Sequence, residues 1–91
     1  MKLSTRDIRK IFKYLIDGKI SREEADRWAY IRIKALDSND LSFLPKSDEK
    51  ILWDGVLYLF GIDIKISPDE YMYSIEDIEE EYVLKWKNKD A

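Results

Sequence analysis

The sequence predicts an all-α protein, a compact bundle of about four helices that begins with an αα-hairpin. Two observations predict this class: apolar residues recur at helical spacing in four segments, and Ser caps and Gly stops separate those segments. The chain has 91 residues, of which 45% are hydrophobic and 38% are charged. A chain of this size and composition is expected to form one helical domain over residues 1–91.

The first two predicted helices are separated by only a few residues. Ser4 with Asp7 three positions later is typical of a capping box, and Gly18 supplies the left-handed residue that ends a helix. A second capping box, Ser21 with Glu24, starts the next helix. A link this short forces the two helices to pack against each other as an αα-hairpin.

Two further helices are predicted in the second half of the chain. One starts near Ser47 and ends at Gly61, and its apolar residues cover more than half of its circumference, so we expect it to be the most buried helix. The string Ser67-Pro68-Asp69-Glu70 is typical of a helical N-terminus and predicts a short turn. Ser74 with Asp77 is a third capping box and starts the last helix. Strands are not expected.

Missing residue types disfavour catalysis and metal binding. The chain has no His and no Cys, so the usual general base, thiol nucleophile and zinc ligands are absent. Asp37, Asn39 and Asp48 fall at calcium-ligand positions of an EF-hand count, but Leu41 stands where a ligand is needed and Ser42 where the turn glycine is needed. We therefore expect no enzyme activity, no metal and no cofactor.

The length of the apolar runs indicates where in the cell the protein is expected. No run approaches the roughly 20 residues that cross a bilayer, and the first residues enter a charged amphipathic segment rather than a signal peptide. We therefore expect no membrane partner and a cytoplasmic location.

The charges are distributed unevenly along the chain. Residues 1–36 carry ten basic and five acidic side chains, whereas residues 37–91 carry six lysines and fourteen acids. The basic half is compatible with a DNA-binding regulator of the helix-turn-helix kind, whose phosphate contacts would be Arg22, Arg27, Arg32 and Lys34. The pI near 5.0 and the acidic half would repel phosphate, so nucleic acid is not the partner we expect.

The segment 69–82 combines dense acids with three tyrosines. Tyrosine offers a large contact area with a hydrogen-bonding tip, and acids beside it complement a basic partner. An ordinary acidic helix start with core tyrosines is the alternative explanation. The candidate partner-binding residues are Asp69, Glu70, Tyr71, Tyr73, Glu76, Asp77 and Glu80.

Three strings carry a resemblance to a known family: KISREEADRWA (19–29), LWDGVLYLFGID (52–63) and YMYSIED (71–77). Together they resemble small bacterial immunity proteins of contact-dependent growth inhibition systems. The resemblance implies a protein that binds and neutralises a cognate toxin domain, often a nuclease, inside the producing cell.

We therefore expect an antitoxin-like inhibitor whose acidic C-terminal half occludes the active site of a basic nuclease toxin. Two alternatives remain open. One is the DNA-binding regulator described above. The other is a structural adaptor or homodimer that buries the aromatic surface of the helix containing Trp53.

Overall fold

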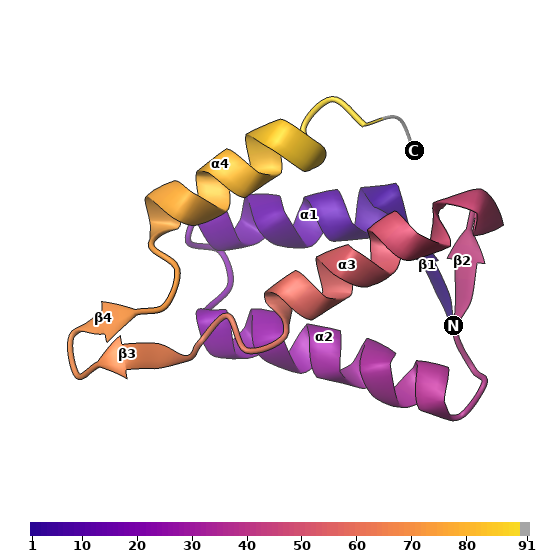
Figure 1. The fold of residues 1–91 in the computed structure, drawn as a ribbon, viewed down its shortest axis with the longest axis horizontal. Helices are drawn as coiled ribbons and strands as arrows, with labels where there is room; N and C mark the ends of the chain where they lie inside the picture. Colours follow the sequence, from indigo (N-terminus) through magenta and orange to yellow (C-terminus); the bar gives the residue numbers. More distant parts are fainter. Residues whose placement is uncertain (90–91) are drawn as a thin grey trace.

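A computed structural model describes residues 1–89, and within them the chain forms four α-helices. Successive helices run in alternating directions across the molecule, with α1 and α2 behind and α3 and α4 in front (Figure 1). The helices are α1 (Thr5–Ile16), α2 (Arg22–Asp37), α3 (Glu49–Leu59) and α4 (Ile75–Lys85), and a 3-10 turn, η1 (Lys46–Asp48), precedes α3. The mostly helical, compact class predicted from the sequence is confirmed.

Three helices begin with a capping box, as predicted. The Ser4, Ser21 and Ser74 side chains each accept a hydrogen bond from the backbone N–H three residues later. The acid at that third position accepts one in return from the serine N–H. Each box pairs backbone donors that a helix start leaves unpaired, which fixes where the helix begins. Gly18 and Gly61 adopt φ values of 73° and 81°, which few other residues tolerate, and the chain turns there after α1 and α3.

The expectation that no strand forms is wrong. Strand β1 (Lys2–Ser4) pairs in parallel with β2 (Ser42–Leu44), so the segment before α1 lies beside the segment before η1 and α3. Leu3 and Phe43 face each other in this ladder and are both buried. A three-residue strand is too short to show an alternating pattern, because only its central residue reaches the core.

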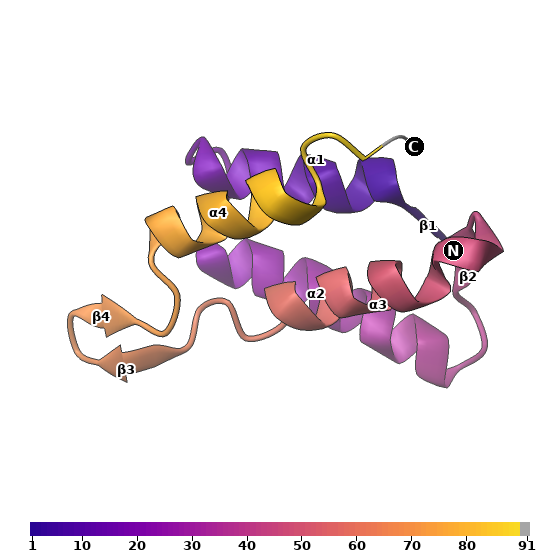
Figure 2. The same cartoon turned by 45° about the horizontal axis from the view of Figure 1, so that its top comes forward.

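A second departure lies between α3 and α4. Strand β3 (Lys65–Ser67) and strand β4 (Glu70–Tyr71) form an antiparallel hairpin, with Ser67 opposite Glu70. The string from Ser67 to Glu70, expected to start a helical turn, therefore forms the hairpin turn. The same residue types suit both structures, because Pro favours the second position of a β-turn as well as the first turn of a helix. The hairpin projects from the end of the bundle in both views (Figures 1 and 2).

One hydrophobic core joins the four helices and β1–β2. The Phe12 ring of α1 lies at its centre, stacked on Tyr58 at 5.6 Å and on Trp86 at 6.0 Å between ring centroids. The fully buried large side chains are Leu3, Ile8, Phe12, Leu52, Val56, Leu59, Ile62, Ile78 and Trp86. No helix within residues 1–89 has the length and apolar character needed to cross a membrane.

Helix α3 is less buried than its composition suggests. Leu52, Val56 and Leu59 are fully buried, but Leu57 and Phe60 are each 46% exposed. In a bundle of this size a central helix has neighbours on only part of its circumference, so some of its apolar side chains stay at the surface. Tyr58 is half-buried through its stacking on Phe12.

Candidate nucleic-acid interface

The outward face of α1 carries a row of basic side chains. Ile8 and Phe12 point into the core, whereas Arg6, Lys10 and Lys13 are exposed. These three positions have the i, i+4, i+7 spacing that places side chains on one side of a helix. Exposed lysines also lie just before and just after α1, and we call the whole set the α1 basic face: Lys2, Arg6, Lys10, Lys13 and Lys19.

Tyr14 lies between two cations of the α1 basic face. The Nζ atoms of Lys10 and Lys19 are 5.5 Å and 5.6 Å from the centroid of its ring. The Lys19 N–H also donates to the Tyr14 carbonyl at 2.8 Å. The turn that follows α1 is therefore held against the helix end, and Lys19 joins the same surface as Lys10.

Few acids neutralise this face. The carboxylate of Asp7 accepts hydrogen bonds from Ser4 as part of the α1 cap. Asp17 lies 3.6 Å from the Lys13 ammonium group and pairs with that residue. No ion pair within residues 1–89 includes Lys2, Arg6, Lys10 or Lys19, so these four charges are available to a polyanion.

The helix-turn-helix alternative placed the DNA contacts on α2, but two of the four basic residues of that helix serve the fold instead. The Arg22 guanidinium lies 3.9 Å above the ring of Tyr71 and donates to the carbonyls of Ile62 and Tyr73 at 3.2 Å and 2.8 Å. These contacts hold the β3–β4 hairpin and the segments beside it against the start of α2. The Arg22 guanidinium therefore has few N–H groups left to donate to a phosphate.

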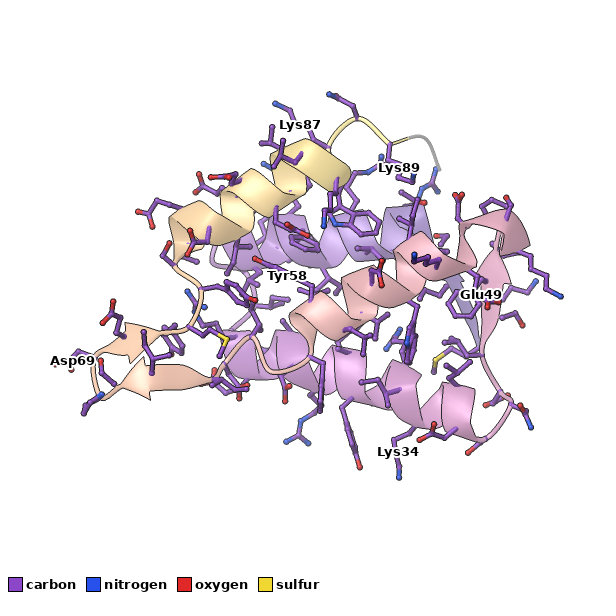
Figure 3. The ribbon with its side chains drawn as sticks, in the orientation of Figure 1. Lys34, Glu49, Tyr58, Asp69, Lys87 and Lys89 are labelled. Atoms are coloured by element: carbon purple, nitrogen blue, oxygen red, sulfur yellow. The ribbon has the colours of Figure 1, made fainter. Side chains whose placement is uncertain are left out.

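Arg32 is half-buried and is engaged by a residue of its own helix. Its guanidinium lies 4.1 Å above the Trp28 ring and donates to the Trp28 carbonyl at 3.3 Å. Burial lowers the pKa of Arg32, and the nearby Asp7 carboxylate opposes that shift. Only Arg27 and Lys34 remain exposed on α2, and Lys34 points away from the molecule (Figure 3).

Helices α1 and α2 are joined by a short link. The two helices run in nearly opposite directions in both views (Figures 1 and 2). The predicted αα-hairpin is therefore present.

The predicted partner-binding residues divide between two hollows beside the hairpin. Asp69, Glu70, Tyr71 and Asp77 line one of about 450 Å³ together with Arg22. Asp69 itself lies at the tip of the hairpin (Figure 3). Their carboxylates make this region repel phosphate, so it lies outside the candidate interface.

The second hollow, of about 440 Å³, is lined by Tyr73, Glu80 and again Asp77. Asp77 therefore belongs to both hollows, whereas Glu76 lines neither of them. The ring of Tyr73 stacks on Tyr58 at 5.0 Å between centroids. Tyr73 is thus a packing residue as much as a surface residue.

Tyr58 also lines this second hollow, and its hydroxyl has a raised pKa. Burial raises the pKa of its hydroxyl to about 12, and the neighbouring Glu81, Tyr73 and Asp77 add to the rise. Both burial and nearby negative charge disfavour the phenolate. Tyr58 therefore stays a neutral packing residue at ordinary pH. Among residues 1–89 no group of three or more Asp or Glu is placed to hold a metal ion.

The sequence contains a signal for the α1 basic face. Arg6, Lys10 and Lys13 occupy the polar side of a helix whose apolar stripe had been identified. The helix-turn-helix alternative placed the DNA contacts on the second helix, because such a motif has its recognition helix there. What the sequence did not reveal was that Arg22 and Arg32 are engaged by Tyr71 and Trp28.

The chain is similar in sequence to one curated bacterial protein. It is 33% identical over 66 residues to a Bacillus subtilis (strain 168) protein described as uncharacterized protein YxzC. The match covers 72% of this chain and 48% of the relative, so the chain spans about half of that protein's length. No solved structure matches it.

A family model described as YxzC DNA-binding protein matches residues 3–86, which is almost the whole chain. This match overturns the expected membership of the contact-dependent immunity proteins, and with it the antitoxin function and the toxin partner. The family's description names DNA, so the expectation that nucleic acid is no partner is also contradicted. The chain belongs to the YxzC DNA-binding protein family.

Proposed function

We propose that this chain binds DNA, and that the α1 basic face contacts the phosphate backbone. The observation that carries the proposal is the exposed, largely unpaired row of cations along one side of α1. The family's description supports the same class of function. The DNA-binding regulator, which the sequence offered as an alternative, thus becomes the leading hypothesis. The helix proposed to contact DNA is α1 instead of α2.

The dimensions of the row suit a phosphate backbone. Arg6 and Lys13 are seven residues apart on α1, which is about 10 Å along the helix axis. Successive phosphates of one strand advance about 3.4 Å along the duplex axis, so the row extends past about three of them. Lys2 and Lys19 are exposed just before and just after the helix.

The uneven charge of the molecule would orient it on DNA. Exposed acids are concentrated on β4 and α4, for example Glu70, Glu76 and Glu80. These surfaces repel a phosphate backbone, while the outward side of α1 attracts it. Phosphate contacts of this kind position a protein without reading sequence, so the proposal is for contact with the backbone and not with particular bases.

The test is a titration of a fluorescently labelled DNA duplex, followed by anisotropy at several salt concentrations. Replacing Arg6 and Lys10 together by Gln should weaken binding roughly 50-fold near 0.1 M salt, because each lost phosphate contact removes about 0.9 from the slope of log K against log salt. The matched control replaces Arg27 and Lys34 of α2 by Gln, which removes the same charge.

The control variant should bind almost as well as the wild-type protein. Equal losses of DNA affinity in the two variants would mean that only the total charge of the protein matters. A larger loss of affinity in the control variant would place the interface on α2. A wild-type protein that binds no duplex at low salt would refute the proposed function itself.

A further inference from the structure

The fold leaves one apolar surface on α3 and α2 uncovered. Trp53, Leu57 and Phe60 have the i, i+4, i+7 spacing that places side chains on one side of a helix. Trp53 is half-buried, whereas Leu57 and Phe60 are exposed. Tyr30 of α2 and Ile64, which follows α3, are exposed as well. We call these five residues the apolar face.

Contacts on the page join the apolar face into one surface. The Tyr30 ring stacks on the Phe60 ring at 6.4 Å between centroids. The Ile64 side chain folds back over Gly61, where an added Cβ would lie 2.9 Å from Ile64 Cδ1. Gly61 directly follows Phe60, and Leu57 lies one turn before Phe60 on the same side of α3. The apolar face is therefore continuous, and it contains no charged side chain.

The area of the apolar face can be compared with what a dimer needs. Four of its side chains are each 46–50% exposed. A fully buried aromatic side chain covers roughly 150–250 Å², so these four together leave on the order of 350 Å² in contact with water. Apolar patches of this size on a monomer are often functional.

Two copies packed face to face would bury enough surface for a stable contact. They would remove about 700 Å² of apolar area, and apolar atoms make up about 65% of a homodimer interface, so the total would be about 1,100 Å². A biological interface needs about 1,000 Å², and one near that limit is expected to be weak. The apolar face is thus sufficient for a weak dimer.

The two edges of the apolar face differ in charge. On the α2 edge, Arg27 and Lys34 are both exposed, and the Lys34 ammonium lies 5.9 Å from the centroid of the Tyr30 ring. On the other edge, Asp54 lines a hollow between α3 and the end of α4, and Lys50 lies one turn before it. No ion pair within residues 1–89 includes any of these four residues.

These charges favour one of the two ways in which two copies can pack. If the α2 edges of the two copies faced each other, Arg27 and Lys34 of one copy would repel those of the other. If the two-fold axis runs along α3, the α2 edge of each copy lies instead beside the edge of the other copy that carries Asp54. The second arrangement avoids a contact between two purely basic edges.

We propose that a second copy of this chain covers the apolar face, in a homodimer whose two-fold axis runs along α3. This is the homodimer alternative that the sequence left open. None of the residues of the apolar face belongs to the α1 basic face. The proposal therefore does not depend on DNA binding, and its tests contain no DNA.

The first test is sedimentation equilibrium over a range of protein concentrations. The wild-type protein should associate to a dimer with a dissociation constant on the order of 10 µM, because the interface is small. Leu57→Glu should weaken association at least about tenfold, because the dimer would bury an unpaired charge. The matched control is Leu84→Glu, since Leu84 is 72% exposed on α4 and lies outside the apolar face.

Two outcomes of this test would overturn the proposal. One is a wild-type protein that stays monomeric at about 1 mM, a hundredfold above the expected dissociation constant. The other is an equal loss of association in the Leu57→Glu and Leu84→Glu variants. Circular dichroism of each variant confirms that its helices are intact.

A second test uses the absence of cysteine from the chain. Leu57 lies in the middle of the apolar face, so the two-fold axis brings two copies of Leu57 together. Leu57→Cys should therefore form a disulfide-linked dimer under mild oxidation, which requires Cα atoms within about 7 Å of each other. Leu84→Cys should stay largely monomeric. Equal cross-linking of the two variants would contradict the assigned face.

The arrangement of the two copies is tested by charge. Asp54→Lys makes both edges basic, so it should weaken association about threefold or more at low salt. Glu79→Lys is the matched control, since Glu79 is exposed on α4 and makes the same change of charge. Equal dissociation constants for these two variants would overturn the proposed two-fold axis along α3.

Discussion

The packing of Gly55 against Trp86 gives a sharp prediction about stability. Replacing a helical Gly by Ala normally stabilises a helix by about 1 kcal/mol. At Gly55 the new methyl group would lie 2.7 Å and 3.0 Å from two ring carbons of Trp86 and 3.1 Å from a methyl group of Ile8. Trp86 and Ile8 are both buried and cannot move aside freely.

The two effects have opposite signs, and the steric one is larger. Overpacking a well-packed core costs about 1–3 kcal/mol, whereas the gain in helix propensity is about 1 kcal/mol. Because a 2.7 Å contact lies at the severe end of overpacking, we expect Gly55→Ala to lower the free energy of unfolding by about 1–2 kcal/mol. Urea denaturation followed by the helical circular dichroism signal measures this change.

A double-mutant cycle with Trp86→Phe identifies the cause. Phenylalanine lacks the two ring carbons that the new methyl group meets, so the loss from Gly55→Ala should shrink by about 1 kcal/mol in that background. A Gly55→Ala variant as stable as the wild-type protein would refute the reasoning, because the indole could not then lie where the structure places it. Equal losses in both backgrounds would also contradict it.

Two further predictions concern contacts of α2 and α3. The Asp26 carboxylate accepts a hydrogen bond from the Gly61 N–H at 2.6 Å, so Asp26→Ala should cost about 1–3 kcal/mol in urea denaturation, and Asp26→Asn, which keeps an oxygen there, should cost less. A similar loss in both variants would argue against this bond. The pKa of Tyr58 is raised from 10.0 to about 12, so the folded state resists its ionisation. The stability that Tyr58 contributes should be fully present below about pH 10 and decline as pH rises towards 12. Tyr58→Phe should make the decline shallower, and an unchanged decline would mean that other groups cause it.

The helix boundaries could be predicted because they depend on local chemistry. The capping boxes at Ser4, Ser21 and Ser74 use residues three positions apart, and the turns at Gly18 and Gly61 depend on single residues. Each of these capping and turn signals is contained within a short stretch of sequence.

The strands could not be predicted because they depend on distant partners. Leu3 pairs with Phe43 across forty residues, and no pattern within either three-residue segment reveals the other. The string from Ser67 to Glu70 suits a helix start and a β-turn equally, and pairing of β3 with β4 decides between them.

The interface could be predicted only in part. The sequence placed the positive charge in the first half of the chain, but a charge count does not separate free cations from engaged ones. Arg22 lies against the ring of Tyr71, which comes from a distant segment of the chain. Arg32 lies against the ring of Trp28, one turn earlier in the same helix. The free cations are on α1, where Arg6 and Lys10 have no acid partner within residues 1–89.

DNA contact with the outward side of α1 is tested most directly by backbone 1H–15N NMR of the protein titrated with a short duplex. We expect the amide signals that move to lie in residues 2–19, with the largest shifts around Arg6, Lys10 and Tyr14. These signals should return towards their free positions as salt is added. Shifts confined to α2 or to the β3–β4 hairpin, or none at all at low salt, would contradict it.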